Sequence, residues 1–253
     1  MPLIPGAEPL SHDGGPIGVL VIHGFTGSPK SMRPWAEHLV EAGFTVEMPR
    51  LPGHGTTWQD MSVTRWEDWY AEVDRVLTSL LSRCEQVFVM GLSMGGSLTL
   101  RLAERRGSDI AGIVLVNPAV HTERKDAVLL PVLRHLVKAF PGVRNDIKKP
   151  GVDEGAYEKM PLQCVYSLQS AWKDIRADIR SVTVPVVLLH SREDHIVEPS
   201  NAAWILANVA SPDVTEVVLE NSYHVATVDN DAELIFTTSV DFVHRVAGSA
   251  AQA

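Results

Sequence analysis

The chain contains 253 residues, of which 45 % are hydrophobic and 21 % charged, a balance that excludes the disordered and membrane-spanning classes. Its length suits one large α/β domain better than two small domains. It carries 22 Lys and Arg against 31 Asp and Glu, a formal net charge of −9, which argues against nucleic acid or anionic lipid as the main partner.

The cysteines and the N-terminal segment bear on the compartment. Cys84 and Cys164 show no metal-ligand spacing, so we predict no disulfide framework and a reducing environment. Residues 1–16 are broken by proline and glycine and lack the basic start and apolar run of a signal peptide. Since no apolar run reaches the length that a membrane helix needs, we expect a cytoplasmic protein without stable membrane insertion.

Short apolar runs rich in Val and Ile alternate with longer amphipathic stretches along the chain. The predicted strands cover residues 17–23, 44–48, 86–90, 110–116, 186–190 and 216–219. The predicted helices cover residues 32–42, 66–81, 94–105, 202–209 and 232–246. Strands that are apolar on both faces and alternate with helices predict a mostly parallel, doubly wound α/β sheet within a single domain over residues 1–253.

A long insertion interrupts this alternation after the fourth predicted strand. Roughly 70 residues separate this strand from the next, far more than a crossover connection needs. The segment contains helical patterns at residues 127–140 and 162–179. We therefore predict a helical cap or lid over residues 120–180, the alternative being a longer edge helix with loops.

A nucleophile motif follows the third predicted strand. Residues 91–96 read GLSMGG, a match to G-x-S-x-G between a strand and a helix. In this setting the chain turns sharply, and Ser93 is held with its hydroxyl exposed beyond the end of the sheet. The following helix directs its partly positive N-terminus at the same place. This context predicts that Ser93 is a catalytic nucleophile.

Serine needs a base, and the base needs an orienting acid. In this type of sheet the partners follow the serine in the order acid, then histidine. Asp194 lies just beyond the strand at 186–190 and is the predicted acid, with Glu193 and Glu198 as competitors. His224 lies in the loop between the last predicted strand and the last helix, so it is the predicted base.

The loop after the first predicted strand reads HGFTGS and is suited to an oxyanion hole. We predict that the amides of Phe25 and Met94 are the two donors. His23 is expected to orient this loop, and His54 to lie in a turn beside the pocket. No phosphate-binding glycine motif, H-E-x-x-H pattern or Cys–His cluster is present, so neither a metal nor a cofactor is predicted.

Five segments together carry a family resemblance. They read HGFTGSPKSM, LPGHGTT, GLSMGGS, HSREDHIVEP and LENSYHVATVDND. In these segments the chain resembles the bacterial monoacylglycerol lipases and the related small carboxylesterases of the α/β-hydrolase superfamily. The resemblance covers about residues 17–231, is poorest in the cap, and implies the same nucleophile, acid, base and oxyanion donors.

The resemblance also implies a substrate-binding glutamate in the cap. The segment DIKKPGVDEGAY suggests Glu154 for the glycerol head group, with Asp153 beside it as an alternative and a solvated loop acid as the other interpretation. His23, His54 and Ile147 are further candidates for substrate contact. Several apolar cap residues are expected either to line an acyl-chain tunnel or to pack the cap onto the core: Leu129, Leu130, Leu133, Leu136 and Val137.

The function predicted from these residues is hydrolysis of carboxylic esters through an acyl-enzyme on Ser93, with monoacylglycerols as the expected substrates. A general carboxylesterase for short- to medium-chain esters is one alternative, and cleavage of an amide or C–C bond by the same triad is another. The Ser, Asp and His in order argue against a fold kept only for binding. The expected partner is a small lipid ester, with transient contact to lipid surfaces.

Overall fold

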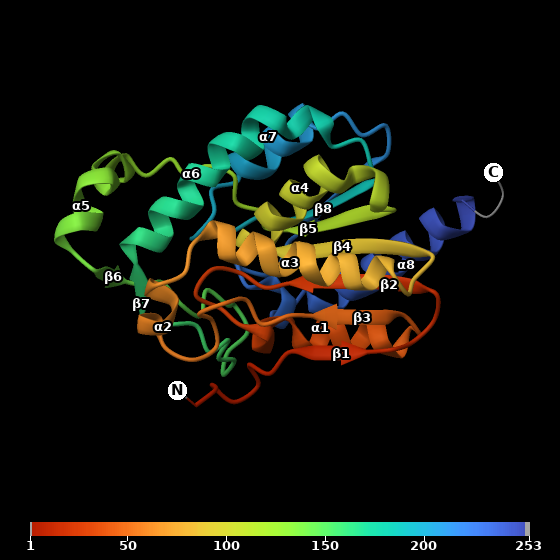
Figure 1. Ribbon diagram of the computed structural model, residues 1–253, viewed down its shortest axis with the longest axis horizontal. Helices are drawn as coiled ribbons and strands as arrows, with labels where there is room; N and C mark the ends of the chain where they lie inside the picture. Colours follow the sequence, from red (N-terminus) through yellow and green to blue (C-terminus); the bar gives the residue numbers. More distant parts are fainter. Residues whose placement is uncertain (1, 251–253) are drawn as a thin grey trace.

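The computed structural model describes residues 2–250, and a seven-stranded sheet forms its centre (Figure 1). The strand order is β1-β3-β2-β4-β5-β8-β9, parallel throughout except for β1, which pairs with β3 in the antiparallel sense. The strands are β1 Leu10–His12, β2 Ile17–Ile22, β3 Thr45–Met48, β4 Gln86–Leu92, β5 Gly112–Val116, β8 Val186–Ser191 and β9 Val214–Leu219. The predicted sheet is confirmed, with the short edge strand β1 added.

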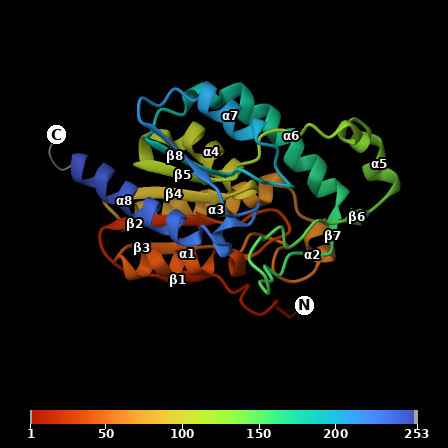
Figure 2. The ribbon, with the colours of Figure 1, turned by 180° about the vertical axis from the view of Figure 1, so that it is seen from behind.

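Helices cover both faces of this sheet. Helices α1 (Pro29–Glu41) and α8 (Ala232–Ala250) lie on one face, as Figure 2 shows. Helices α3 (Trp66–Leu81), α4 (Met94–Arg106), α6 (Leu162–Asp178) and α7 (Ser200–Asn208) lie on the other. Alternate residues of β2 enter the two cores, Leu20 with α3 and Val19 with α1, which is why this strand is apolar on both faces.

Helix ends differ from the predicted ones for local reasons. Helix α1 begins at Pro29, three residues earlier than predicted, because the Ser28 hydroxyl accepts from the Lys30 amide and proline suits the first helical turn. A short helix, α2 (Trp58–Ser62), was not predicted; the Thr57 hydroxyl caps it by accepting from the Asp60 amide at 3.2 Å. None of the helices within residues 2–250 is both long and apolar enough to cross a membrane.

The cap differs most from its prediction. The expected helix over residues 127–140 is broken into a 3₁₀ turn (Lys125–Leu129), helix α5 (Leu130–Leu136) and strand β6 (Ala139–Pro141). Strand β6 pairs with β7 (Lys159–Pro161) in an antiparallel hairpin, which takes up the residues that would have extended the helix. The helix thus ends where a long-range strand pair begins.

Helix α6 matches the second helical pattern of the insertion and joins the cap to the core. Its face formed by Cys164, Leu168, Ala171 and Ile175 is buried with α3 and α4 against the sheet. The same helix is therefore the crossover between β5 and β8, and its first turns lie beside the cap hairpin (Figure 1). This arrangement places the cap over the ends of the central strands.

Candidate active site

Ser93 occupies a strained turn between β4 and α4. Its backbone has φ 57° and ψ −115°, a conformation that residues with a Cβ rarely adopt. A Cβ on Gly95 would collide with the backbone carbonyl of Ile22, and one on Gly91 would collide with the Gly95 backbone. Glycine at these two positions lets β4 turn into α4 while Ser93 projects beyond the sheet.

Asp194 and His224 are brought together although 30 positions separate them in the sequence. His224 Nδ1 lies 2.8 Å from Asp194 Oδ2. The other carboxylate oxygen of Asp194 accepts the amide hydrogens of Ile196 and Val197, each at 2.8 Å. Both oxygens are thus engaged, which fixes the carboxylate toward the imidazole and leaves Nε2 as the free nitrogen of the ring.

The two competitors for the acid position point elsewhere. Glu193 is exposed and lies 3.5 Å from the Lys148 ammonium. Glu198 accepts the amide hydrogen of Glu123 at 3.0 Å and the hydroxyl hydrogen of Thr122 at 3.2 Å. Of the three carboxylates considered from the sequence, Asp194 is the one in contact with His224.

The charges around His224 set its basicity. Burial on its own would lower its pKa, but the Asp194 charge and hydrogen bond outweigh burial, and Glu154 and Asp146 add to them, so the pKa of His224 is raised. For Asp194, burial acts to raise the pKa, but the His224 charge, the bond to His224 and the two amides prevail and lower it. The pair therefore favours an ionised acid beside a strengthened base.

Ser93, Asp194 and His224 line one cavity of about 420 Å³. Ser93 is 8 % exposed and His224 is 7 % exposed, so both reach the cavity from largely buried positions. Within residues 2–250, no hydrogen bond joins the Ser93 hydroxyl to His224 in this structure. Such catalytic hydrogen bonds often tighten only when substrate binds.

Phe25 and Met94 provide two amides beside Ser93. Phe25 lies on the loop after β2 and lines the cavity, whereas Met94 is the first residue of α4. Neither amide donates to an acceptor among the described residues. Unpaired amides at a loop and at a helix N-terminus are suited to hold a developing oxyanion.

His23 and His54 lie behind this loop and do not line the cavity. The Leu51 amide donates to His23 Nε2 at 3.2 Å, so Nδ1 carries the hydrogen and donates to the Gly24 carbonyl at 2.9 Å. Burial lowers the pKa of His23 to about 4 and that of His54 well below its ordinary value. Both imidazoles are therefore neutral, and His23 links the loop after β2 to the segment after β3.

Glu154 lines the cavity, whereas Ile147 does not. Glu154 is 9 % exposed, and its Oε1 accepts the Asn145 amide hydrogen at 2.7 Å. Ile147 packs instead against the core on the α1 and α8 side. The predicted substrate contact of Ile147 is therefore not supported; Val143, four residues earlier in the chain, lines the cavity instead. Of the predicted apolar residues, Leu130 and Leu133 also line it, whereas Leu129 and Leu136 are exposed.

Asn117, which sequence reasoning missed, ties the loops together from the end of β5. It adopts φ 44°, and its side-chain amide donates to the His224 carbonyl at 2.8 Å and to the Ser191 hydroxyl at 3.0 Å. Its side-chain oxygen accepts the Ser191 amide hydrogen at 2.7 Å. A single asparagine after a strand gives no sequence signal of such a role, because all its partners are distant in sequence.

Asp146, also missed, joins the cap to both triad loops. One carboxylate oxygen lies 2.8 Å from His195 Nδ1, and the other accepts the amide hydrogens of His195 at 3.2 Å and His224 at 3.1 Å. The neighbouring residues Lys148 and Lys149 donate their amides to Asp229, at 2.6 and 2.8 Å. The cap segment carrying Glu154 is thus anchored next to the loops of Asp194 and His224.

Comparison with known proteins places this chain among serine hydrolases. A family model described as "Serine aminopeptidase, S33" (Hydrolase_4) matches residues 17–231. The chain belongs to this family. A thermostable monoacylglycerol lipase of Bacillus sp. (strain H-257) is 43 % identical over 98 % of both chains. A carboxylesterase of Bacillus subtilis (strain 168) is 28 % identical over 94 % of this chain and 97 % of the relative.

Solved structures support the same relationship. A structure reported with the metagenome-derived lipolytic enzymes LipS and LipT superposes with a TM-score of 0.94 at 42 % identity, over 96 % of this chain and all of the other. The monoacylglycerol lipase of Paleococcus ferrophilus has a TM-score of 0.77 at 20 % identity, a likeness of fold, over 94 % of this chain and 99 % of the other. The expected α/β-hydrolase fold and the predicted kinship with bacterial monoacylglycerol lipases and carboxylesterases are confirmed.

Proposed function

We propose that this chain hydrolyses carboxylic esters, with monoacylglycerols as substrates and fatty acid and glycerol as products. The observation that carries the proposal is the cavity itself. It joins Ser93 and the Asp194–His224 pair to a buried carboxylate, Glu154, while most of its remaining wall is apolar. An apolar wall suits an acyl chain, and a carboxylate acceptor suits the hydroxyls of a glycerol head group. The activities named for the 43 % and 28 % identical relatives support the same chemistry.

The geometry supports a two-step reaction. His224 Nε2 accepts the Ser93 proton as the hydroxyl oxygen attacks the ester carbonyl, and the Phe25 and Met94 amides hold the resulting oxyanion. The imidazolium then protonates the departing glycerol oxygen, leaving an acyl-enzyme on Ser93. Water, deprotonated by the same imidazole, attacks the acyl group and releases the fatty acid. Asp194 keeps Nδ1 protonated throughout and stabilises the imidazolium.

Glu154 is the group that we propose to select glycerol esters. The Asn145 amide occupies Oε1, and Oε2 has no hydrogen-bond partner among the described residues. Burial raises the pKa of Glu154, although the Asn145 amide and the nearby His224 counteract this effect. Leaving a buried carboxylate oxygen without a hydrogen-bond donor costs free energy, and a substrate hydroxyl that donates to it removes this cost.

The test compares two esters of the same fatty acid, a monoacylglycerol and a methyl ester that offers no hydroxyl. Glu154→Leu should lower kcat/KM for the monoacylglycerol about 10- to 100-fold more than for the methyl ester. Glu158→Leu is the matched control, because Glu158 is a cap acid whose side chain is 75 % exposed. Ser93→Ala should reduce turnover of both esters by about 10⁴-fold.

The ratio of the two rates separates the possible outcomes, because general damage to the cap affects both esters. An unchanged ratio in Glu154→Leu would refute the head-group role and leave a general carboxylesterase. A folded Ser93→Ala protein that keeps substantial activity would refute the ester-hydrolysis mechanism itself. A peptide anilide in the same panel tests amide cleavage, which we expect to be far slower.

A further inference from the structure

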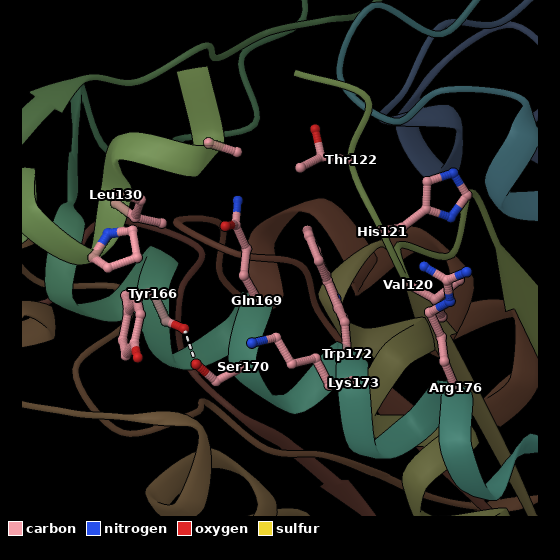
Figure 3. Close-up of a pocket in the computed structure, with 12 residues that line it drawn as sticks. Val120, His121, Thr122, Leu130, Tyr166, Gln169, Ser170, Trp172, Lys173 and Arg176 are labelled. Carbon is pink, nitrogen blue, oxygen red and sulfur yellow. Dashed lines mark hydrogen bonds between the residues drawn. The ribbon is translucent and has the colours of Figure 1, made fainter. Parts of the chain in front are cut away.

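A second hollow lies along α6, and Figure 3 shows the residues that line it. It adjoins the catalytic cavity. This α6 groove has a volume of about 480 Å³ and lies between α6 and the segments 120–122 and 127–131. Its α6 side consists of Tyr166, Gln169, Ser170, Trp172, Lys173 and Arg176. The catalytic cavity and the groove have several lining residues in common, so the two hollows adjoin each other; among these residues are His121, Leu130, Gln169 and Trp172.

The two hollows differ in charge. The catalytic cavity has one arginine, Arg124, which is paired with Asp126, and five carboxylates in its lining: Asp126, Asp146, Glu154, Asp194 and Glu198. The α6 groove has no carboxylate among its described lining residues and instead has the cations Lys173 and Arg176. A fatty acid released at Ser93 is an anion at neutral pH, so the first environment repels it and the second attracts it.

The groove also combines an apolar side with cations that have no acidic partner, a combination suited to an amphiphilic anion. Leu130, Pro131 and Ala127 form an apolar side opposite α6. Within residues 2–250, Lys173 and Arg176 form no ion pair with Asp or Glu. The Arg176 guanidinium lies 4.7 Å from the Trp204 ring centre, which restrains its plane.

Trp172 lines both hollows. The indole N–H of Trp172 is buried and has no hydrogen-bond partner among the described residues. This nitrogen has almost no accessible surface, so Trp172 contributes an apolar ring to the wall of the groove rather than a donor to its ligand. His121, on the opposite side, is held by a 2.8 Å hydrogen bond to the Ser200 hydroxyl.

We propose that the α6 groove binds the free fatty acid anion, with its carboxylate at Lys173 and Arg176 and its chain against Leu130 and Pro131. The groove would then hold the reaction product next to the cavity that releases it, and added fatty acid would occupy the same place. This inference rests on the proposed function, because a fatty acid is its product.

The test measures decanoate binding by calorimetry after an alkyl phosphonate has been attached to Ser93 to fill the catalytic cavity. We expect decanoate to bind the blocked protein, and the double variant Lys173→Gln/Arg176→Gln to bind it about three- to tenfold more weakly, since both cations are exposed to solvent. The double variant Lys149→Gln/Arg180→Gln makes the same change in net charge at exposed residues outside the groove and should bind decanoate like the unchanged protein. Decanol, which lacks the charge, should bind the two double variants equally.

Failure of decanoate to bind the blocked protein, or equal binding by the two double variants, would overturn the fatty-acid site. Loss of decanol binding in parallel with decanoate would also overturn it, because it would show a change of shape rather than of charge. Failure of the phosphonate to label Ser93 would instead refute the proposed function, so the two failures are distinguishable.

Discussion

At the scale of single residues, the basicity of His224 depends on carboxylates beyond its hydrogen-bonded partner. Burial lowers the pKa of His224, Asp194 contributes most of what raises it again, and Glu154 and Asp146 add to that effect. Asp146 belongs to the cap, yet its carboxylate accepts the His224 amide hydrogen at 3.1 Å. A cap residue is therefore part of the electrostatic environment of His224, in addition to the loop that carries Asp194.

The variant Asp146→Asn tests this role through the pH dependence of kcat/KM. His224 must be neutral to accept the Ser93 proton, so activity is lost as the pH falls through its pKa. Removing the negative charge of Asp146 lowers the pKa of His224, and the acid limb should move to lower pH. The asparagine side chain retains an oxygen for the two amides, whereas Asp146→Ala loses this anchor and should lower kcat/KM about 10- to 100-fold by misplacing the loops.

The matched control is Glu193→Gln, which removes a charge next to Asp194 from a side chain that is 58 % exposed. Water and salt screen such a charge, so its acid limb should stay in place. An unmoved limb in Asp146→Asn would show that Asp146 acts only as a structural anchor.

At the scale of elements, the turn from β4 into α4 is the most constrained piece of backbone in the site. Ser93 is held at φ 57° by close packing of Gly91 and Gly95 against neighbouring main chain. The neighbours are backbone atoms of β2 and of the turn itself, which are buried and cannot rotate away. Strain at the nucleophile therefore depends on the rigidity of two central strands.

Gly95→Ala should accordingly lower the free energy of unfolding by about 1–3 kcal/mol or more and abolish ester hydrolysis, because overpacking displaces the turn from β2. Gly248→Ala is the control in α8, where an added Cβ meets nothing within 4 Å. It should raise the free energy of unfolding by about 0.5–1 kcal/mol, the usual gain for alanine in a helix. Urea unfolding measures both changes, and a fully stable, active Gly95→Ala protein would contradict the account of the turn.

At the scale of the whole molecule, the cap presents an apolar outer surface. Val128 is 77 % exposed, Val132 63 % and Leu136 75 %, all within the 3₁₀ turn and α5. Figure 1 shows α5 beyond the ends of the central strands. Contiguous exposed apolar side chains are typical of surfaces that meet other molecules or lipid. We propose that this cap face touches lipid aggregates transiently while substrate enters the neighbouring cavity.

The double variant Val132→Ser/Leu136→Ser tests this contact. It should reduce the rate on monoacylglycerol dispersed in vesicles several-fold, up to about tenfold. Full burial of an apolar side chain contributes about 1.5 kcal/mol or more, and each serine forfeits part of this binding free energy at the lipid surface. The rate on a dissolved short-chain ester should not change. Val214→Ser, at the opposite, amino end of β9, serves as the control and should affect neither rate. Equal losses on both substrates would contradict a role in lipid contact.

The sequence by itself determined the sheet, the order of its elements and the identity of the candidate triad. Ser93, Asp194 and His224 each follow a predicted strand, and the carboxyl ends of parallel strands meet at one edge, so order along the chain already implied proximity. Hydrophobic periodicity is a local property, and the buried strands showed it clearly. The glycine requirement at 91 comes from the sharp turn itself, whereas that at 95 also depends on the neighbouring backbone of β2.

Only the tertiary structure decided what the cap contributes. Long-range hydrogen bonds join distant segments to Asp146, Asn117 and Asp229. A single polar residue in a loop belongs to no sequence pattern from which its partners could be predicted. The expected helix over residues 127–140 was cut short by the β6–β7 pairing, and Ile147 turned to the core rather than to the cavity. Such outcomes depend on which surfaces meet after folding, because long-range pairing and burial override local propensity.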